Sequence, residues 1–265
     1  MLKVSLQNSV LTLTLNRPEV HNALNSELVS LLLEALKKYE ADSHVRVVVL
    51  CGEGKTFCSG GDIAWLKSLG EEAKKNEKGK RKNLSEAKRL AELFYSLNHY
   101  SKPVIACAKG QVMGGGFGLV SVCDYILAHE KTNLSLSELR IGIVPSVILP
   151  FVLAKIGESQ TRRLMITGEK IGSEEAKNLN LIHEIYQDES NMEQKLNHVI
   201  SQVLKSAPGA LARGKKLIQE IKHKNPDDVF EHVSETLAQV RAASEAQEGL
   251  SAFLEKRTPK WLTSV

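Results

Sequence analysis

Two glycine-rich segments each lie between a predicted strand and a predicted helix, at residues 57–63 and 110–118. A strand that enters a helix through glycines leaves backbone N–H groups without acceptors at the helix N-terminus, where the helix dipole adds positive charge. Glycine also lets a ligand approach that backbone closely. Two such segments facing one point would form an oxyanion hole, in which one donor is worth about 100- to 1000-fold in rate. Taken singly, each segment is equally well explained as a tight turn for strand–helix packing.

A carboxylate completes this set of groups that could do chemistry. Glu138 precedes the sequence Ile141-Gly142-Ile143 and is flanked by apolar side chains at Leu136 and Leu139. Partial burial would raise its pKa toward neutrality, which suits a group that accepts and returns a proton. On position alone, a surface or helix-capping glutamate is the simpler interpretation.

Other motifs in the chain are incomplete. Gly54-Lys55-Thr56 ends like a phosphate-binding P-loop, but Val49 stands where the first glycine is required. No G-x-S-x-G sequence surrounds Ser59, so a nucleophile elbow is not indicated. The histidines lack the spacing of metal ligands, and the cysteines form no C-x-x-C pair. The sequence therefore predicts no metal site and no nucleotide triphosphate site.

Composition limits the partners. The net charge is +4 over 265 residues, so no global polyanion-binding signal exists. Residues 71–89 contain eight basic and four acidic side chains, and we expect them to form a solvated helix or loop rather than an RNA-binding patch. No apolar run approaches the roughly 18 residues of a membrane span, and the first 14 residues resemble no targeting signal. We expect a cytoplasmic protein with reduced core thiols.

The elements that must position these groups alternate between strand and helix. Residues 3–6 and 10–15 predict a hairpin around Asn8-Ser9, and Asn25 or Ser26 can cap a following helix. Residues 45–51, 104–108 and 125–128 are buried-strand patterns. After about residue 187 helices dominate, and the longest are predicted at 192–204, 208–221 and 227–255. This order predicts an α/β core over residues 1–187 and a helical region over 188–265.

Taken together, these segments resemble the enoyl-CoA hydratase/isomerase, or crotonase, superfamily over essentially the whole chain. The matching segments, in chain order, are Asn16-Arg17-Pro18, Asn22-Ala23-Leu24, Phe57-Cys58-Ser59-Gly60-Gly61-Asp62, Gly114-Gly115-Gly116, Cys123-Asp124, Glu138, Gly142-Ile143, Pro145, Leu164-Met165-Ile166-Thr167-Gly168 and Gly249-Leu250-Ser251-Ala252-Phe253-Leu254.

The resemblance implies a spiral of ββα units that assembles into homotrimers or hexamers and binds acyl-CoA thioesters, without a metal or redox cofactor. Gly61 and Gly115 fall on the oxyanion-hole positions, and Glu138 falls on a catalytic glutamate position. The positions expected to line the substrate are Ala23, Ser59, Gly60, Asp62, Ile63, Gly114, Gly118 and Arg140.

One position departs from the typical hydratase pattern. Such hydratases carry two glutamates, and the first of these positions is Gly118 here. The surrounding residues are similar to hydratases that act on methylglutaconyl-CoA and related substrates, whose second carboxylate Arg140 could pair with. We therefore predict an enoyl-CoA hydratase. The alternatives are a double-bond isomerase that uses Glu138 as its single proton shuttle, and a non-catalytic acyl-CoA- or RNA-binding relative.

Overall fold

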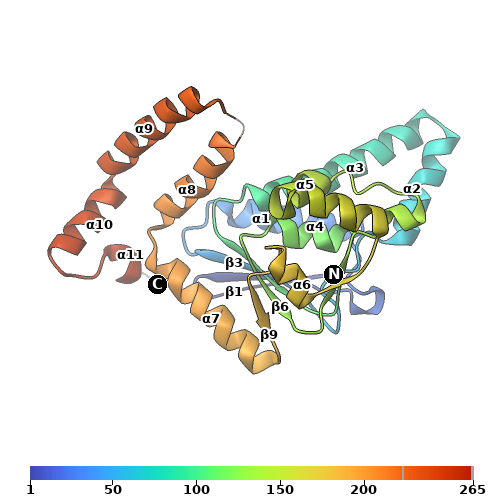
Figure 1. Ribbon diagram of the computed structural model, residues 1–265, viewed down its shortest axis with the longest axis horizontal. Helices are drawn as coiled ribbons and strands as arrows, with labels where there is room; N and C mark the ends of the chain where they lie inside the picture. The colour runs from blue at the N-terminus through green and yellow to red at the C-terminus, as the bar shows by residue number, and fades with distance from the viewer. Residues whose placement is uncertain (223, 264–265) are drawn as a thin grey trace.

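The computed structural model describes residues 1–222 and 224–263, and its centre is a six-stranded sheet (Figure 1). The strand order is β1-β2-β3-β4-β6-β9; β1 pairs antiparallel with β2, and every other pairing is parallel. The strands are β1 (Leu2–Gln7), β2 (Val10–Leu15), β3 (Val47–Gly52), β4 (Val104–Ala108), β6 (Tyr125–His129) and β9 (Glu184–Tyr186). This α/β arrangement confirms the predicted fold class.

The opening hairpin forms where the sequence predicts it. Asn8 and Ser9 both have positive φ angles, of 47° and 63°. A two-residue turn of this kind matches the right-handed twist of the flanking strands, and asparagine tolerates the left-handed region better than most residues. Val10–Leu15 then pairs with Val47–Gly52, which begins the parallel part of the sheet.

Helices cover both faces of the sheet, because its central strands are apolar on both sides. Leu50 and Ala106 face α1 (Ser26–Glu40), α3 (Glu77–Asn98), α4 (Gly115–Val122) and α5 (Leu149–Thr167) in the main core. Val49 and Cys107, one residue away on each strand, face α7 (Glu189–Lys205) in a second core. Figure 1 shows α7 on the opposite side of the strands from α1, α4 and α5.

A second, three-stranded sheet lies beside the two glycine-rich segments. It consists of β5 (Gln111–Met113), β7 (Asn133–Ser135) and β8 (Ile171–Gly172) in the order β5-β7-β8. Strands of two or three residues are too short to produce a periodic signal, so the sequence did not predict this sheet as such. It matters for the site because β5 leads directly into α4 and β7 leads toward Glu138.

The last helices extend away from the sheet (Figure 1). They are α8 (Pro208–Ile221), α9 (Pro226–Ala242), α10 (Ser244–Leu254) and α11 (Lys260–Thr263), while the short α6 (Ser173–Asn178) precedes β9. The helix expected over 227–255 is divided, because Ala243 has an extended conformation between α9 and α10. The predicted boundary at 187/188 falls before α7, yet α7 packs on the sheet, so α8 is the first helix that leaves the core.

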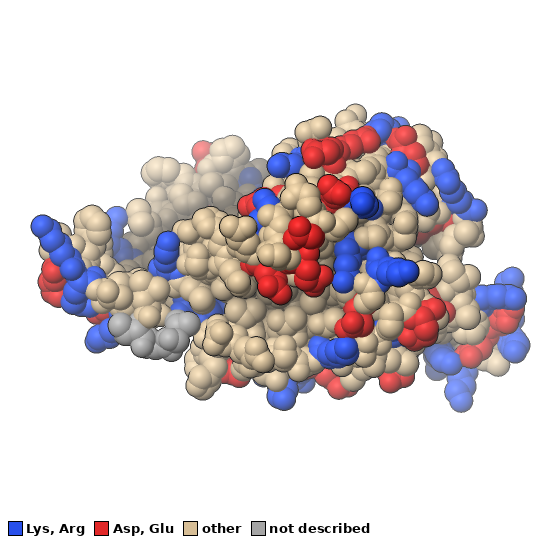
Figure 2. All heavy atoms as spheres, turned by 90° about the horizontal axis from the view of Figure 1, so that it is seen from below, with Lys and Arg blue, Asp and Glu red and all other residues tan. Residues whose placement is uncertain are grey.

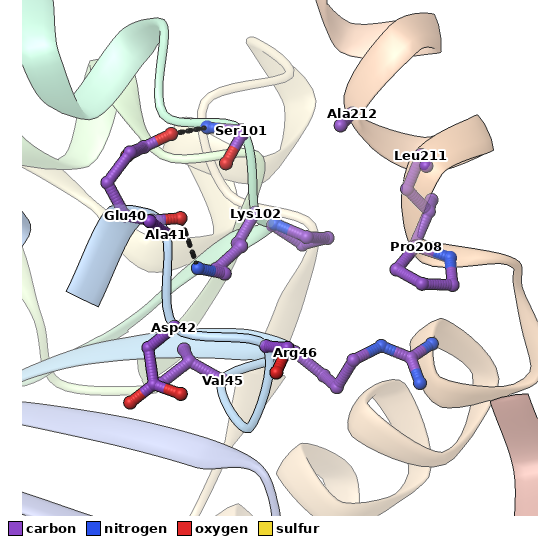
Figure 3. A pocket seen from close by; sticks show the side chains of 13 residues that line it. Glu40, Ala41, Asp42, Val45, Arg46, Ser101, Lys102, Pro208, Leu211 and Ala212 are labelled. Atoms are coloured by element: carbon purple, nitrogen blue, oxygen red, sulfur yellow. Dashed lines mark hydrogen bonds between the residues drawn. The ribbon is translucent and has the colours of Figure 1, made fainter. Parts of the chain in front are cut away.

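A cavity of about 270 Å³ lies between the core and α8 (Figure 3). The two cationic side chains in its wall donate hydrogen bonds to backbone carbonyl oxygens. The Arg46 guanidinium donates to the carbonyl oxygens of Ser206 at 2.8 Å and Trp261 at 3.2 Å, and the Lys102 ammonium donates to those of Tyr39 and Glu40 at 2.6 Å. The Arg46 bonds fasten the helical extension to the core, whereas the Lys102 bonds join the end of α1 to the segment before β4. The cavity therefore lies at the junction between the core and the extension.

The predicted basic stretch is helical. It covers the end of α2 (Ile63–Lys75) and the beginning of α3, where Lys82 pairs with Glu72 at 2.9 Å and Lys80 with Glu77 at 2.6 Å. Figure 2 shows acidic and basic side chains interspersed over the face that it displays. No helix in the described ranges combines the length and the apolar character of a membrane span.

Candidate active site

The two glycine-rich segments are joined side by side by backbone hydrogen bonds. The N–H of Cys58 donates to the carbonyl of Gln111 at 3.3 Å, and the N–H of Met113 donates to the carbonyl of Cys58 at 3.0 Å. Glycine is required at 116, because an added Cβ would lie only 2.2 Å from the Cys58 carbonyl oxygen. The sequence analysis expected glycine to permit close approach of a ligand. At Gly116 it instead permits close approach of the other glycine-rich segment.

Gly61 and Gly115 keep their backbone N–H groups available at this contact. The neighbours of Gly61 are paired, since Leu24 donates to Gly60 at 2.7 Å and Asp62 donates to Leu24 at 2.8 Å. Gly115 is the first residue of α4. Across the described residues, neither glycine N–H donates to a backbone carbonyl. A Cβ added to Gly60 would lie 3.5 Å from the Gly115 nitrogen, which shows how near the two segments are.

Buried polar side chains hold the first of these segments in place. The Asn22 side chain is fully buried; it accepts from the Arg17 N–H at 2.8 Å and donates to the carbonyls of Glu53 at 2.9 Å and Thr56 at 2.6 Å. The Arg17 guanidinium donates to the Ala23 carbonyl at 2.5 Å. These two residues carry much of the family resemblance, and the structure gives them a positioning role.

Asp62 starts helix α2 and pairs with Arg17. Its carboxylate accepts from the N–H groups of Ala64 and Trp65 at the helix N-terminus and from the Arg17 guanidinium at 3.0 Å. Burial alone would raise the pKa of Asp62, but these donors lower it below its usual range. Asp62 therefore stays ionised and fixes the turn immediately after Gly61.

Glu138 opens a short 3-10 turn, Glu138–Ile141, that ends on Gly142 in the left-handed region with φ 75°. Its carboxylate lies against Gly114, where an added Cβ would be 3.1 Å from Oε1. Oε2 is buried and has no hydrogen-bond partner among the described residues. Burial raises the pKa of Glu138, and its own backbone N–H opposes this shift only in part. A buried carboxylate with a free oxygen next to Gly115 is poised to exchange a proton with a bound molecule.

These groups meet at a cavity of about 250 Å³. The structure brings seven of the predicted site residues to its wall: Ser59, Gly60, Gly61, Ile63, Gly114, Gly115 and Glu138. The rest of the wall is mainly apolar and comes from α2, α3 and residues 141–148. Ala23, Asp62, Gly118 and Arg140 lie outside the wall.

Gly118 is enclosed by side chains of the core. An added Cβ would lie 2.2 Å from Cγ2 of Ile148 and 3.0 Å from Cε1 of Phe94. Ile148 and Phe94 themselves line the cavity, whereas Gly118 does not. A glutamate at this position would have no room, and the site therefore works without one from α4.

Arg140 points away from the cavity wall. Its guanidinium donates to the Thr167 carbonyl at 3.0 Å, and the side chain lies against Gly168, where a Cβ would be 2.7 Å from Nε. This contact fixes the turn at Glu138 to the end of α5. Arg140 thus has a structural role here, and it does not line the cavity where a substrate carboxylate would lie.

One face of α3 lines the cavity, and the sequence analysis did not identify the polar residues on this face. These positions follow helical spacing: Asn83, Glu86, Ala87, Leu90 and Phe94. The sequence of this segment indicates a charged, solvated helix, because the other faces of the helix carry most of the lysines and arginines. The sequence does contain one indication of this face: Glu86, Leu90 and Phe94 are spaced four residues apart and therefore lie on one side of a helix.

Thiol chemistry has little place at this site. The four cysteines are free, and burial raises the pKa of Cys58 and of Cys123 to about 12. A thiol with so high a pKa is protonated and poorly nucleophilic near neutral pH. The described residues also contain no cluster of three or more side chains able to hold a metal ion.

Comparison with known proteins agrees with this geometry. The family model described as Enoyl-CoA hydratase/isomerase matches residues 5–264. The structure of an enoyl-CoA hydratase from Shewanella pealeana is similar with a TM-score of 0.91 at 31% identity, covering 98% of this chain and 95% of that one. An enoyl-CoA hydratase/isomerase from Marinobacter aquaeolei also gives a TM-score of 0.91, at 33% identity and 98% coverage of both chains.

A curated relative of similar length has a named activity. The 2,3-dehydroadipyl-CoA hydratase of Escherichia coli is 29% identical over 257 residues, which cover 97% of this chain and 96% of that protein. The match of the family model over nearly the whole sequence, together with the paired glycine segments and Glu138, establishes that this chain is an enzyme of the enoyl-CoA hydratase/isomerase family.

Proposed function

We propose that this protein is an enoyl-CoA hydratase, which adds water across the 2,3 double bond of an acyl-CoA thioester. The observation that carries the proposal is the Glu138 carboxylate, which has one buried oxygen without a partner among the described residues and lies against Gly114. The next residue, Gly115, lines the same cavity, and its N–H donates to no backbone carbonyl among those residues. A proton-transfer group and an oxyanion donor thus share one largely apolar cavity.

The reaction follows from these groups. The thioester oxygen would accept hydrogen bonds from the N–H groups of Gly61 and Gly115, which stabilise the negative charge that develops there. A water molecule attacks the β-carbon and gives a proton to Glu138, while the double-bond electrons form the enolate. Glu138 then returns a proton to the α-carbon. Because burial raises the pKa of Glu138, the gap to the pKa of the enolate carbon is smaller than for an exposed carboxylate.

A double-bond isomerase is the second candidate, and Gly118 favours it. Migration of a double bond needs one base that moves a proton between the α- and γ-carbons, and Glu138 alone could do so. With no space for a carboxylate at Gly118, the wall that α4 contributes offers no second one. The relatives named as hydratases support hydration as the first choice.

The lining of the cavity bears on which acyl group the enzyme accepts. A branched or glutaconyl-type group is predicted from the resemblance, and a free carboxylate on it would need a cation. Arg140 is engaged with Thr167 outside the cavity, and the described wall contains no lysine or arginine. The apolar side chains Trp65, Leu66 and Val147 suit a short aliphatic chain, linear or branched.

The test is a panel of unsaturated acyl-CoAs with linear, branched and carboxylated chains, scored separately for hydration and for double-bond migration. We expect formation of 3-hydroxyacyl-CoA from at least one 2-enoyl substrate, identified by mass and by comparison with a standard. Migration without hydration across the panel would replace the hydratase by the isomerase. No turnover of any member, with tight acyl-CoA binding retained, would indicate a non-catalytic binder.

A further inference from the structure

Helix α3 brings a second carboxylate to the cavity that contains Glu138. Glu86 lies on the stripe Asn83, Glu86, Leu90 and Phe94 that faces the cavity, and its side chain is only 15% exposed. Carboxylates are rarely so buried without close partners. The ion pair of Glu86 is with Arg89, one turn along the same helix, at a long 3.7 Å.

The contacts of Glu86 do not indicate that its carboxylate stabilises the fold. Arg89 also donates to the Ser30 hydroxyl, so its guanidinium is shared with α1. Withdrawing a carboxylate from water is unfavourable, and a pair at this distance offsets little of that penalty. An apolar residue would suit the cavity wall better, as Ala87 and Leu90 beside it illustrate. Glu86 therefore retains acceptor capacity that the folded chain does not use.

The helical hairpin places Glu86 near the oxyanion donors. Helices α2 and α3 are antiparallel, and Glu72 of α2 contacts both Gly79 and Lys82 of α3. Following this register toward the core brings Glu86 to the level of Leu66. Leu66 in turn covers Gly61, where an added Cβ would be 2.8 Å from its Cδ1. The carboxylate thus enters the cavity from the side of Gly61, whereas Glu138 enters from the side of Gly114.

We propose that Glu86 is the second catalytic carboxylate of this hydratase, supplied by α3 because α4 carries Gly118. This inference rests on the proposed hydratase function. Oε2 of Glu138 has no hydrogen-bond partner among the described residues. The cavity of about 250 Å³ has room for a short acyl group and for a water molecule, which needs about 30 Å³.

The roles of the two carboxylates follow from the proton balance. The attacking water has two O–H bonds: one breaks and gives its proton to Glu138, and the other stays with the new 3-hydroxyl group. Glu86 accepts a hydrogen bond from the O–H that stays, which aligns the oxygen with the β-carbon. Glu86 takes no proton from this water, and Asn83, one turn earlier on α3, can add an amide contact to the same molecule. Glu138 alone carries the proton to the α-carbon.

The experiment separates attack by water from proton transfer. Hydration of crotonyl-CoA needs both carboxylates under this scheme. Exchange of an α-hydrogen of butyryl-CoA with D₂O needs only Glu138 and the oxyanion hole, since no water is added. We expect Glu86→Gln to lower kcat for hydration by about 100-fold while KM changes by less than about 5-fold, because a positioned group is lost and the binding surface is kept. Exchange should fall by less than about 3-fold.

Two matched variants control for structure. Glu92→Gln makes the same change on an exposed face of α3 and should leave both reactions unchanged. Arg89→Met removes the partner of Glu86 and should affect hydration by less than about 10-fold, since that pair is long. A structural role for Glu86 would instead lower both reactions together and make Arg89→Met resemble Glu86→Gln.

The outcomes are distinguishable. Loss of hydration with exchange retained supports the second carboxylate. Unchanged hydration in Glu86→Gln, or equal loss of both reactions, overturns it while leaving the hydratase assignment intact. A wild-type enzyme that exchanges the α-hydrogen but hydrates no 2-enoyl-CoA overturns the proposed function, and the role of Glu86 falls with it.

Discussion

At the scale of single residues, Glu138 in the cavity wall and Asp62 just outside it have pKa values shifted in opposite directions. Burial raises the pKa of Glu138, whereas the N-terminus of α2 and Arg17 lower that of Asp62 despite its burial. The first suits a group that must exchange protons, and the second suits a fixed anion that holds a turn. Environment therefore assigns a proton-transfer role to Glu138 and a structural role to Asp62.

These shifts predict opposite effects on the pH dependence of stability. A carboxyl group with a raised pKa in the folded state favours folding at acidic pH, and this contribution is lost as the pH rises through the folded pKa. Glu138→Gln should therefore stabilise the protein at pH 8 but not at pH 4. Asp62 has a lowered pKa, so its contribution is present at neutral pH and is lost on acidification. Asp62→Asn should therefore destabilise the protein at both pH values, because this contribution is lost only as the pH falls below the ordinary pKa of 3.8.

Thermal unfolding of both variants at these two pH values measures the effect. The wild-type protein at each pH is the reference, which cancels titrations elsewhere in the chain. A destabilised Glu138→Gln protein at pH 8 would contradict the view that the ionised carboxylate is held at a cost for catalysis.

The packing around Gly118 gives a second prediction at this scale. Gly118→Ala places a methyl group against the buried Ile148 side chain and should lower the free energy of unfolding by about 1 to 3 kcal/mol through overpacking. Gly214→Ala is the matched control in a helix, because nothing lies within 4 Å of an added Cβ there. It should gain about 0.5 to 1 kcal/mol. Urea titration measures both, and a stabilised Gly118→Ala protein would mean that Ile148 yields easily.

At the scale of elements, the oxyanion segments depend on a network that begins at the second strand. Asn22 and Arg17 follow β2 and hold the segment from Glu53 to Asp62 by hydrogen bonds to carbonyl oxygens and to a carboxylate. The catalytic backbone is thus held by buried side chains from another part of the chain. Loosening this network should affect both stability and rate.

Asn22→Asp tests the network with a nearly isosteric change. A carboxylate would face the carbonyl oxygens of Glu53 and Thr56 in place of an amide donor, so we expect a loss of about 2 to 4 kcal/mol in unfolding free energy. Asn180→Asp is the control, since Asn180 has a similar positive φ of 61° and is exposed. Chemical denaturation reports both changes. Equal effects at the two positions would show that backbone conformation, and not the hydrogen bonds, decides the result.

The sequence predicts the elements that carry strong local signals. The Asn8-Ser9 turn, the Asn25 cap and the buried strand Val104–Ala108 all occur where expected, since turn chemistry, capping and apolar runs are local properties. The glycine segments and Glu138 also meet at one cavity. The sequence could not predict that Gly118 is walled off by Phe94 and Ile148, or that Glu86 faces inward. Both depend on how α3 and residues 145–148 pack against α4, which is a tertiary property.

At the scale of the whole molecule, α9 and α10 expose large apolar side chains that the other described residues leave uncovered. Phe253 is 83% exposed, Leu254 79% and Phe230 75%. Exposed apolar patches of this kind mark association surfaces. The homotrimer or hexamer predicted from the resemblance stays a prediction, in which the extended helices would contact a neighbouring copy.

Phe253→Ser should weaken this assembly, because it removes a large exposed ring from the surface. We expect the molar mass from light scattering at micromolar concentration to fall from that of a trimer or hexamer toward that of one chain. Val4→Ser, at a partly exposed position on β1, is the control and should leave the mass unchanged. A wild-type protein that is monomeric under these conditions would refute the predicted assembly.

The most direct test of the whole account is the turnover of Glu138→Gln on the best 2-enoyl-CoA of the panel. The variant keeps the shape of the side chain and removes its ability to take a proton. We expect kcat to fall at least about 100-fold, with the dissociation constant for acyl-CoA changed by less than about 3-fold. Near-normal turnover in this variant would contradict the assignment of Glu138 as the group that moves the proton.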